Sequence, residues 1–105
     1  MAKEQQLQSQ TIRRLRDRYP SAVILKTDNA GTQGFPDWTM LYGEQYAIFD
    51  FKASQDAVHQ PNQDYYIHQA AKYGAFAMFV YPENVDEFLE ELDDFFFNTR
   101  RRIER

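Results

Sequence analysis

The stretch from residue 34 to residue 54, GFPDWTMLYGEQYAIFDFKAS, decides the fold of this 105-residue chain. It opens with the glycine and proline of a turn and continues as two runs rich in apolar residues, DWTMLYG and EQYAIFDFKA. A short turn near Gly43 and Glu44 separates the runs, which is typical of an antiparallel hairpin. The stretch therefore predicts two adjacent strands, the second of which holds an aspartate and a lysine within its apolar sequence.

The segment before this hairpin predicts a helix and a strand. Residues 4–18 place apolar side chains at helical spacings among glutamines and arginines, so they predict an amphipathic helix that ends at Pro20. Residues 22–26, AVILK, predict a short buried strand. The loop that follows contains Asn, Gly and Pro, and it leads to Asp37 at the start of the next strand.

The segment after the hairpin predicts two helices with a strand between them. NQDYYIHQAAKYG predicts a helix with Asn62 as its N-cap and Gly74 at its end. AFAMFVYP is an apolar strand, and a third helix runs from Asn84 to about Phe97 with apolar residues on one face and acids on the other. The predicted order is αβββαβα, an α/β fold.

Composition limits the class of protein. With 43% apolar and 16% aromatic residues, the chain forms a single domain over 1–105, with a core at about 4–97 and a basic tail at 98–105. The absence of cysteine excludes disulfides, thiolate zinc sites and a cysteine nucleophile. No run approaches the roughly 20 apolar residues of a membrane span, and the start lacks the apolar run of a signal peptide. We therefore expect a soluble, cytoplasmic protein.

The net charge of −4 conceals an uneven distribution. Seven acids lie within residues 83–94, whereas four arginines lie within 13–18 and four within 100–105. These basic groups are either ordinary solvated faces or contacts to the phosphates of DNA. The candidate DNA contacts are Arg13, Arg14, Lys26, Arg100, Arg101 and Arg102.

The charges inside the hairpin's second strand suggest a site. Because side chains alternate along a strand, Asp50 and Lys52 share one face, roughly 6–7 Å apart along its axis. On a half-exposed strand such a pair would be an ordinary solvated edge. Asp37 begins the preceding strand, however, and hairpin pairing can bring its carboxylate beside that of Asp50. Two adjacent carboxylates repel each other unless a cation lies between them.

Oxygen ligands of this kind suit Mg²⁺ or Mn²⁺. Asp37 and Asp50 supply carboxylates, and a backbone carbonyl, assigned to Phe51, completes the protein ligands together with waters. Lys52 lies near enough to hold or deprotonate the attacking water. The residues therefore predict metal-assisted hydrolysis.

The motifs GFPDW and FDFKAS, with Asp50 thirteen residues after Asp37, resemble those of the PD-(D/E)XK nuclease superfamily. Gly34 before the Pro-Asp pair, an acid in the first helix and a glutamine at the start of the helix after the lysine strand are similar to the virus-type replication-repair nucleases and to Holliday-junction resolvases. The resemblance covers about residues 4–81. It implies a restriction-endonuclease-like αβββαβ core with a mixed sheet, to which this chain adds a C-terminal helix.

The resemblance also assigns roles. It makes Asp37 and Asp50 metal ligands and Lys52 the residue that positions the attacking water. It makes Glu4 a further metal ligand and Gln63 a residue that shapes the site. Two alternatives stay open, in which Glu4 is only a favourable acid in the first turn of its helix and Gln63 is a polar surface residue. Asp50 departs from the family, in which glutamate is more common at this position.

The implied activity is that of a small endonuclease acting on branched DNA in replication, recombination or repair. Cutting both strands requires two active sites, so a symmetric homodimer is the simplest assembly. The aromatic-rich helix at 84–97 is a candidate for its interface. The alternative is a non-catalytic DNA-binding or protein-interaction module that keeps the nuclease fold, because a fold alone does not establish chemistry.

Overall fold

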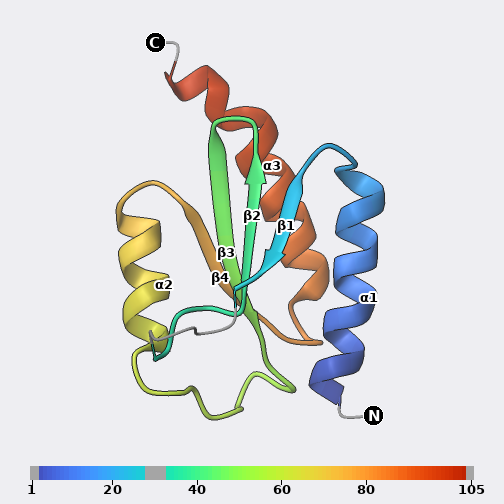
Figure 1. The fold of residues 1–105 in the computed structure, drawn as a ribbon, viewed down its shortest axis with the longest axis vertical. Coiled ribbons are helices and arrows are strands. Elements are labelled where there is room, and N and C mark those ends of the chain that lie inside the picture. Colours follow the sequence, from blue (N-terminus) through green and yellow to red (C-terminus); the bar gives the residue numbers. More distant parts are fainter. Residues whose placement is uncertain (1–2, 28–32, 104–105) are drawn as a thin grey trace.

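The structure is a computed structural model that describes residues 3–27 and 33–103, with side chains up to Phe97 (Figure 1). The predicted α-β-β-β-α-β-α order is confirmed. The elements are α1 (Lys3–Arg18), β1 (Val23–Lys26), β2 (Trp38–Tyr42), β3 (Gln45–Phe51), α2 (Gln63–Lys72), β4 (Phe76–Val80) and α3 (Val85–Ile103). No helix in these ranges is long and apolar enough to cross a membrane.

The four strands form one mixed sheet in the order β1-β2-β3-β4. β2 pairs antiparallel with both β1 and β3, and the predicted hairpin turn lies between Tyr42 and Gln45. β4 pairs parallel with β3. Parallel neighbours need a crossover connection, which α2 supplies between these two strands.

The helices lie on both faces of the sheet. Phe49 of β3 contacts the ring of Phe88 in α3, whereas the next residue, Asp50, hydrogen-bonds to Gln63 of α2. Since successive side chains of a strand point to opposite faces, α2 and α3 cover opposite faces. Tyr19, directly after α1, contacts Phe96 of α3, so α1 shares the α3 face, as Figure 1 shows.

The main core lies between the sheet and the pair α1 and α3. The apolar faces predicted for these two helices are buried there, with Leu15, Phe88 and Leu92 fully enclosed. α3 continues to Ile103, however, where we expected it to end near Phe97. Arginine is a good helix former, and neither Gly nor Pro interrupts this stretch, so the sequence contains no stop signal there.

One local prediction is wrong. The strand at 22–26 was expected to be buried, yet β1 is an edge strand whose Val23 and Leu25 are exposed, because α2 lies over β3 and β4 instead. Asn62 is the N-cap of α2, as predicted, but it has a left-handed backbone (φ 72°) and its side chain makes no capping hydrogen bond. Its carbonyl instead accepts a hydrogen bond from the Tyr66 N–H, as the first turn of the helix requires.

Candidate active site

The charged residues of β3 and its end are buried. Asp50 is 1% exposed and Lys52 is 6% exposed. Both lie on the face of the sheet that α2 covers. The alternative of a solvated strand edge is therefore wrong, and the pair needs an explanation that justifies placing charge in the interior.

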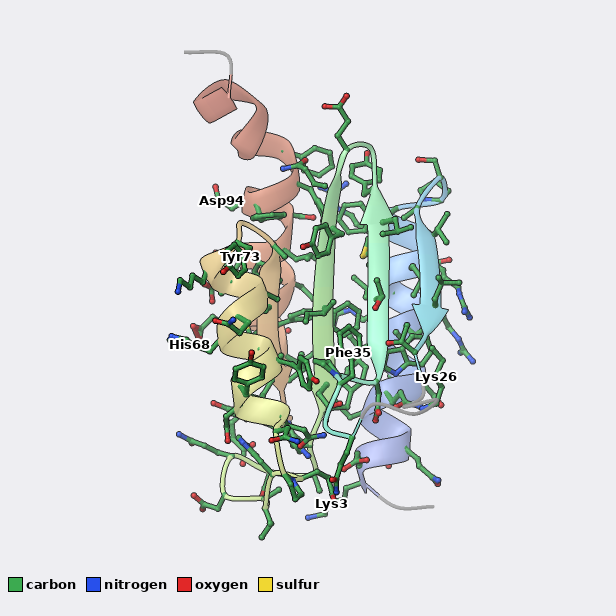
Figure 2. The ribbon with its side chains drawn as sticks, turned by 60° about the vertical axis from the view of Figure 1, so that its left-hand side comes forward. Lys3, Lys26, Phe35, His68, Tyr73 and Asp94 are labelled. Atoms are coloured by element: carbon green, nitrogen blue, oxygen red, sulfur yellow. The ribbon has the colours of Figure 1, made fainter. Side chains whose placement is uncertain are left out.

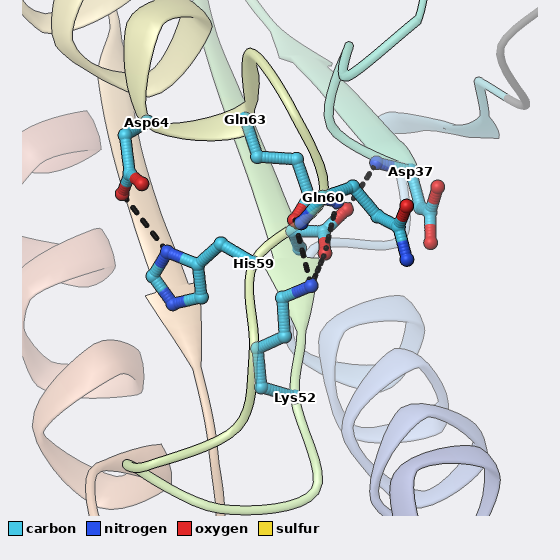
Figure 3. Close-up of polar contacts among 7 residues, drawn as sticks. Asp37, Lys52, His59, Gln60, Gln63 and Asp64 are labelled. Atoms are coloured by element: carbon cyan, nitrogen blue, oxygen red, sulfur yellow. Dashed lines mark hydrogen bonds and ion pairs between the residues drawn. The ribbon is translucent and has the colours of Figure 1, made fainter.

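The carboxylate of Asp50 is held by groups from three parts of the chain (Figure 3). Its Oδ1 accepts a hydrogen bond of 2.8 Å from the backbone N–H of Asp37. Its Oδ2 accepts a hydrogen bond of 3.2 Å from Gln63 Nε2 and lies 3.4 Å from Lys52 Nζ. These contacts fix the position of the Asp50 carboxylate between the turn, the end of β3 and α2.

Gln63, the first residue of α2, joins this strand to the helix. Its Oε1 accepts hydrogen bonds of 2.7 Å from Lys52 Nζ and 2.8 Å from the Gln60 N–H, while its Nε2 donates to Asp50. Gln63 is only 5% exposed, so the alternative of a polar surface residue is wrong. We call Asp50, Lys52 and Gln63 the Asp-Lys-Gln cluster.

The Gly-Phe-Pro turn fixes the position of Asp37. Gly34 has φ +89°, and a Cβ at this position would lie 2.2 Å from the carbonyl oxygen of Pro61. Only glycine fits here, since it tolerates positive φ and has no side chain to collide with the 61–62 backbone. Thr27 holds the other side of the turn, because its N–H donates to the Asp37 carbonyl and its hydroxyl to the Pro36 carbonyl.

A loop at 53–62 adjoins the cluster, and no sequence motif indicates how it is held. His59 stacks on Phe79 with ring centroids 4.0 Å apart, and its Nδ1 lies 2.9 Å from an Asp64 carboxylate oxygen. These contacts hold the loop where the next residue, Gln60, donates its backbone N–H to Gln63. Gln60 acts through its main chain, so its residue type carries no signal of this role.

The donor set fits Mg²⁺ in the mode where one or two carboxylates bind the ion together with waters and substrate phosphates. Asp37 and Asp50 are neighbours, although their hydrogen bond runs from the Asp37 backbone to the Asp50 carboxylate rather than between two carboxylates. Within the described ranges, no group of three or more His, Cys, Asp or Glu side chains could hold a metal ion. Glu4 therefore does not join Asp37 and Asp50 in a three-acid site. The carbonyl of Phe51 stays a predicted ligand.

The predicted DNA-contacting residues lie in different environments. Arg14 Nη1 is 3.9 Å from an Asp86 carboxylate oxygen of α3, so its charge is partly offset. Arg13 is exposed on α1, and Lys26 is exposed at the end of β1. The side chains of Arg100, Arg101 and Arg102 lie outside the described residues. Of these described side chains, Arg13 and Lys26 therefore lie at one common hollow, whereas Arg14 faces α3.

No protein-family model, no curated protein and no solved structure matches this chain. The resemblance to PD-(D/E)XK nucleases therefore depends on the motifs of the sequence, and the functional argument depends on the geometry of the cluster.

Proposed function

We propose that the protein is a metal-dependent endodeoxyribonuclease that hydrolyses phosphodiester bonds, with Mg²⁺ or Mn²⁺ as its cofactor and branched DNA as its favoured substrate. The observation that supports this proposal is the burial of the Asp-Lys-Gln cluster beside Asp37. Burying a charge costs free energy of folding, and replacing a buried ion pair with apolar residues is often neutral or stabilising. A chain that needed only a core would gain nothing from keeping them.

The cluster has the parts that hydrolysis of a phosphodiester requires. A bound divalent cation would stabilise the charge that develops on the phosphate and would lower the pKa of a water molecule. Asp37, Asp50 and the carbonyl of Phe51 would hold the ion. Lys52 is positioned by Gln63 and Asp50, so that its ammonium group can orient the attacking water. Water is the nucleophile, and no covalent intermediate is needed.

One observation favours the alternative of a non-catalytic module. Lys52 already bonds to Gln63 and pairs with Asp50, and only a small part of its side chain is exposed. In a purely structural role the cluster would join β3 to α2 and bind no metal. The two functions differ in whether substrate and metal reach Lys52.

The decisive experiment is cleavage of labelled branched and linear DNAs in the presence of Mg²⁺, Mn²⁺ or EDTA. We expect cleavage with either metal, none with EDTA, and none in Asp50→Asn with any addition. Binding of the DNAs without cleavage under every condition would support the non-catalytic module. Cleavage that persists in EDTA or in Asp50→Asn would overturn the assignment of the site.

The homodimer stays part of this proposal, but we move its interface away from the helix at 84–97. The aromatic face of α3 is buried in the core of its own chain, which leaves mainly acids on its outer surface. An uncovered row of apolar side chains crosses the sheet instead, because Val23 pairs with Leu41 and Leu41 pairs with Tyr46. All three are exposed. We therefore assign the interface to this row, and we keep a cytoplasmic location within the same proposal.

A further inference from the structure

A hollow lies on the face of the sheet opposite the Asp-Lys-Gln cluster, between α1 and the strands β1 and β2. Its volume is about 530 Å³, within the range of ligand pockets. Its charged lining comes from Arg13, Arg16 and Asp17 of α1 and Lys26 of β1, and Trp38 of β2 forms part of its wall. We call it the α1 pocket. Trp38 is the cross-strand partner of Phe49, so its side chain points to the α1 and α3 face, away from the Asp-Lys-Gln cluster.

The charge of the α1 pocket is positive, with three cations against one carboxylate. The arginines of α1 divide into two groups. Arg14 pairs with Asp86, and Arg18 pairs with Asp93 at 3.1 Å, so acids of α3 offset both charges. The other two arginines, Arg13 and Arg16, line the α1 pocket and form no ion pair with any residue that the structure describes. The positive potential of α1 is therefore concentrated on the pocket side.

Trp38 contributes its ring, and not its N–H, to the wall of the pocket. It is 7% exposed, and Lys26 Nζ lies 5.4 Å from the centroid of its ring. Its indole N–H is buried and has no hydrogen-bond acceptor among the described residues. The N–H is closed to solvent, so the direct contacts for a ligand rich in acceptors are the guanidinium groups of Arg13 and Arg16.

We propose that the α1 pocket binds a backbone phosphate of a nucleic-acid strand. Arginine suits this ligand because its planar donors match the oxygens of a phosphate group. The pocket and the Asp-Lys-Gln cluster share the start of β2, since the Asp37 N–H contacts Asp50 while Trp38, the next residue, lines the pocket. Figure 2 shows Lys26 and Phe35 toward the same end of the sheet. One strand can therefore cross that end and reach both sites.

The proposal rests on the proposed function only in its choice of nucleic acid as the source of the phosphate. It is tested without any cleavage. Trp38 is the only tryptophan of the chain, so its emission reports directly on the pocket. The protein is titrated in EDTA with a short single-stranded DNA and, separately, with inorganic phosphate, at several salt concentrations. The test variant is Arg13→Gln/Arg16→Gln, and its matched control is Arg14→Gln/Arg18→Gln, which removes the same charge from the α3 side of the helix.

We expect DNA to change the Trp38 emission saturably in the unmodified protein and in the control. In Arg13→Gln/Arg16→Gln the slope of log affinity against log salt should be smaller by about 1.4, since each phosphate contact to a single strand contributes about 0.7. Circular dichroism checks that both variants are folded, and their substituted side chains are all exposed.

Three results would overturn the proposal: equal weakening in both double variants, DNA binding that leaves the Trp38 emission unchanged, or saturation by inorganic phosphate at the concentrations where DNA saturates. A saturable Trp38 response in a protein that cleaves no DNA would remove the nuclease proposal and leave the pocket in place. Cleavage that is unaffected by Arg13→Gln/Arg16→Gln, with no Trp38 response, would remove the pocket proposal and leave the nuclease proposal in place.

Discussion

Asp50 and Lys52 are each tolerable in the interior only because the other is present. The Lys52 ammonium lies 3.4 Å from the Asp50 carboxylate, and Gln63 bonds to both. Removing one member of a buried ion pair leaves an uncompensated charge, which is far more costly than removing both. The stability of the fold and the chemistry of the proposed site are therefore coupled at these residues.

This coupling is tested by Lys52→Met and the double variant Asp50→Asn/Lys52→Met. The single change should abolish cleavage and lower the free energy of unfolding by about 3–5 kcal/mol, because it leaves a carboxylate buried without its cation. The double variant should recover a large part of that stability and remain inactive. Urea unfolding and the cleavage assay measure the two effects. If the destabilisations of Lys52→Met and Asp50→Asn, each measured alone, simply add in the double variant, the pair does not interact as we infer.

The turn before β2 is the element that fixes the geometry of the candidate site, because it positions the Asp37 N–H to donate to the Asp50 carboxylate. Gly34→Ala should destabilise the fold by more than about 2 kcal/mol and impair cleavage, because left-handed backbone costs about 1–2 kcal/mol and the new Cβ would meet the Pro61 carbonyl at 2.2 Å.

Gly43→Ala is the matched control for this change. Gly43 also has positive φ, at +64°, but a Cβ there would meet no atom within 4 Å. It should therefore show only the backbone cost of about 1–2 kcal/mol, with cleavage retained. Equal losses in the two variants would show that the contact between the turn and the 61–62 backbone is unimportant. Thermal unfolding and the cleavage assay report the comparison.

The docking of α1 onto α3 should depend on pH. The Tyr19 hydroxyl donates to Asp93, which also accepts from Arg18. Burial, reinforced by Asp93, raises the pKa of Tyr19 above its usual value of 10.0. The folded protein thus holds this proton more tightly than the unfolded chain does, so the stabilisation is complete below about pH 10 and declines as the pH rises beyond it.

Tyr19→Phe should be less stable near neutral pH, because it loses the bond to Asp93, but its stability should fall less above about pH 10. Tyr73→Phe, at an exposed position directly after α2, is the control and should behave like the unmodified protein. Urea unfolding between about pH 8 and 11 provides the comparison. Parallel pH profiles for all three proteins would contradict the assigned role of Tyr19.

The whole molecule shows which features a sequence can predict. The element order and the hairpin followed from local patterns, since periodicity and turn residues act over a few positions. The motifs and their spacing predicted Asp37, Asp50, Lys52 and Gln63 as site residues. The fold brings these residues together.

Features that depend on packing between distant elements were not predictable. The sequence AVILK fits a central strand and an edge strand equally well. β1 is exposed because α2 lies over other strands. The four arginines of α1 look alike in the sequence. Docking of α3 then places acids beside Arg14 and Arg18, whereas Arg13 and Arg16 line the α1 pocket.

The exposed row of Val23, Leu41 and Tyr46 is the interface that we propose for the homodimer. β1 is an edge strand with apolar side chains, and proteins commonly protect such edges because they pair with other chains. A second copy placed over this row would cover the edge and supply the second active site that cutting two strands needs. Leu41→Glu should therefore shift the protein toward the monomer in sedimentation experiments, because it introduces two like charges into a symmetric contact.

In the cleavage assay, Leu41→Glu should nick one strand where the unmodified protein cuts both. Val58→Glu is the control, since Val58 is 86% exposed in the 53–62 loop, outside the row, and should leave the assembly unchanged. A monomeric unmodified protein that cuts both strands at once would contradict the dimer. A dimer that survives Leu41→Glu would place the interface elsewhere, because a symmetric apolar contact cannot accommodate two facing carboxylates without a large loss of affinity.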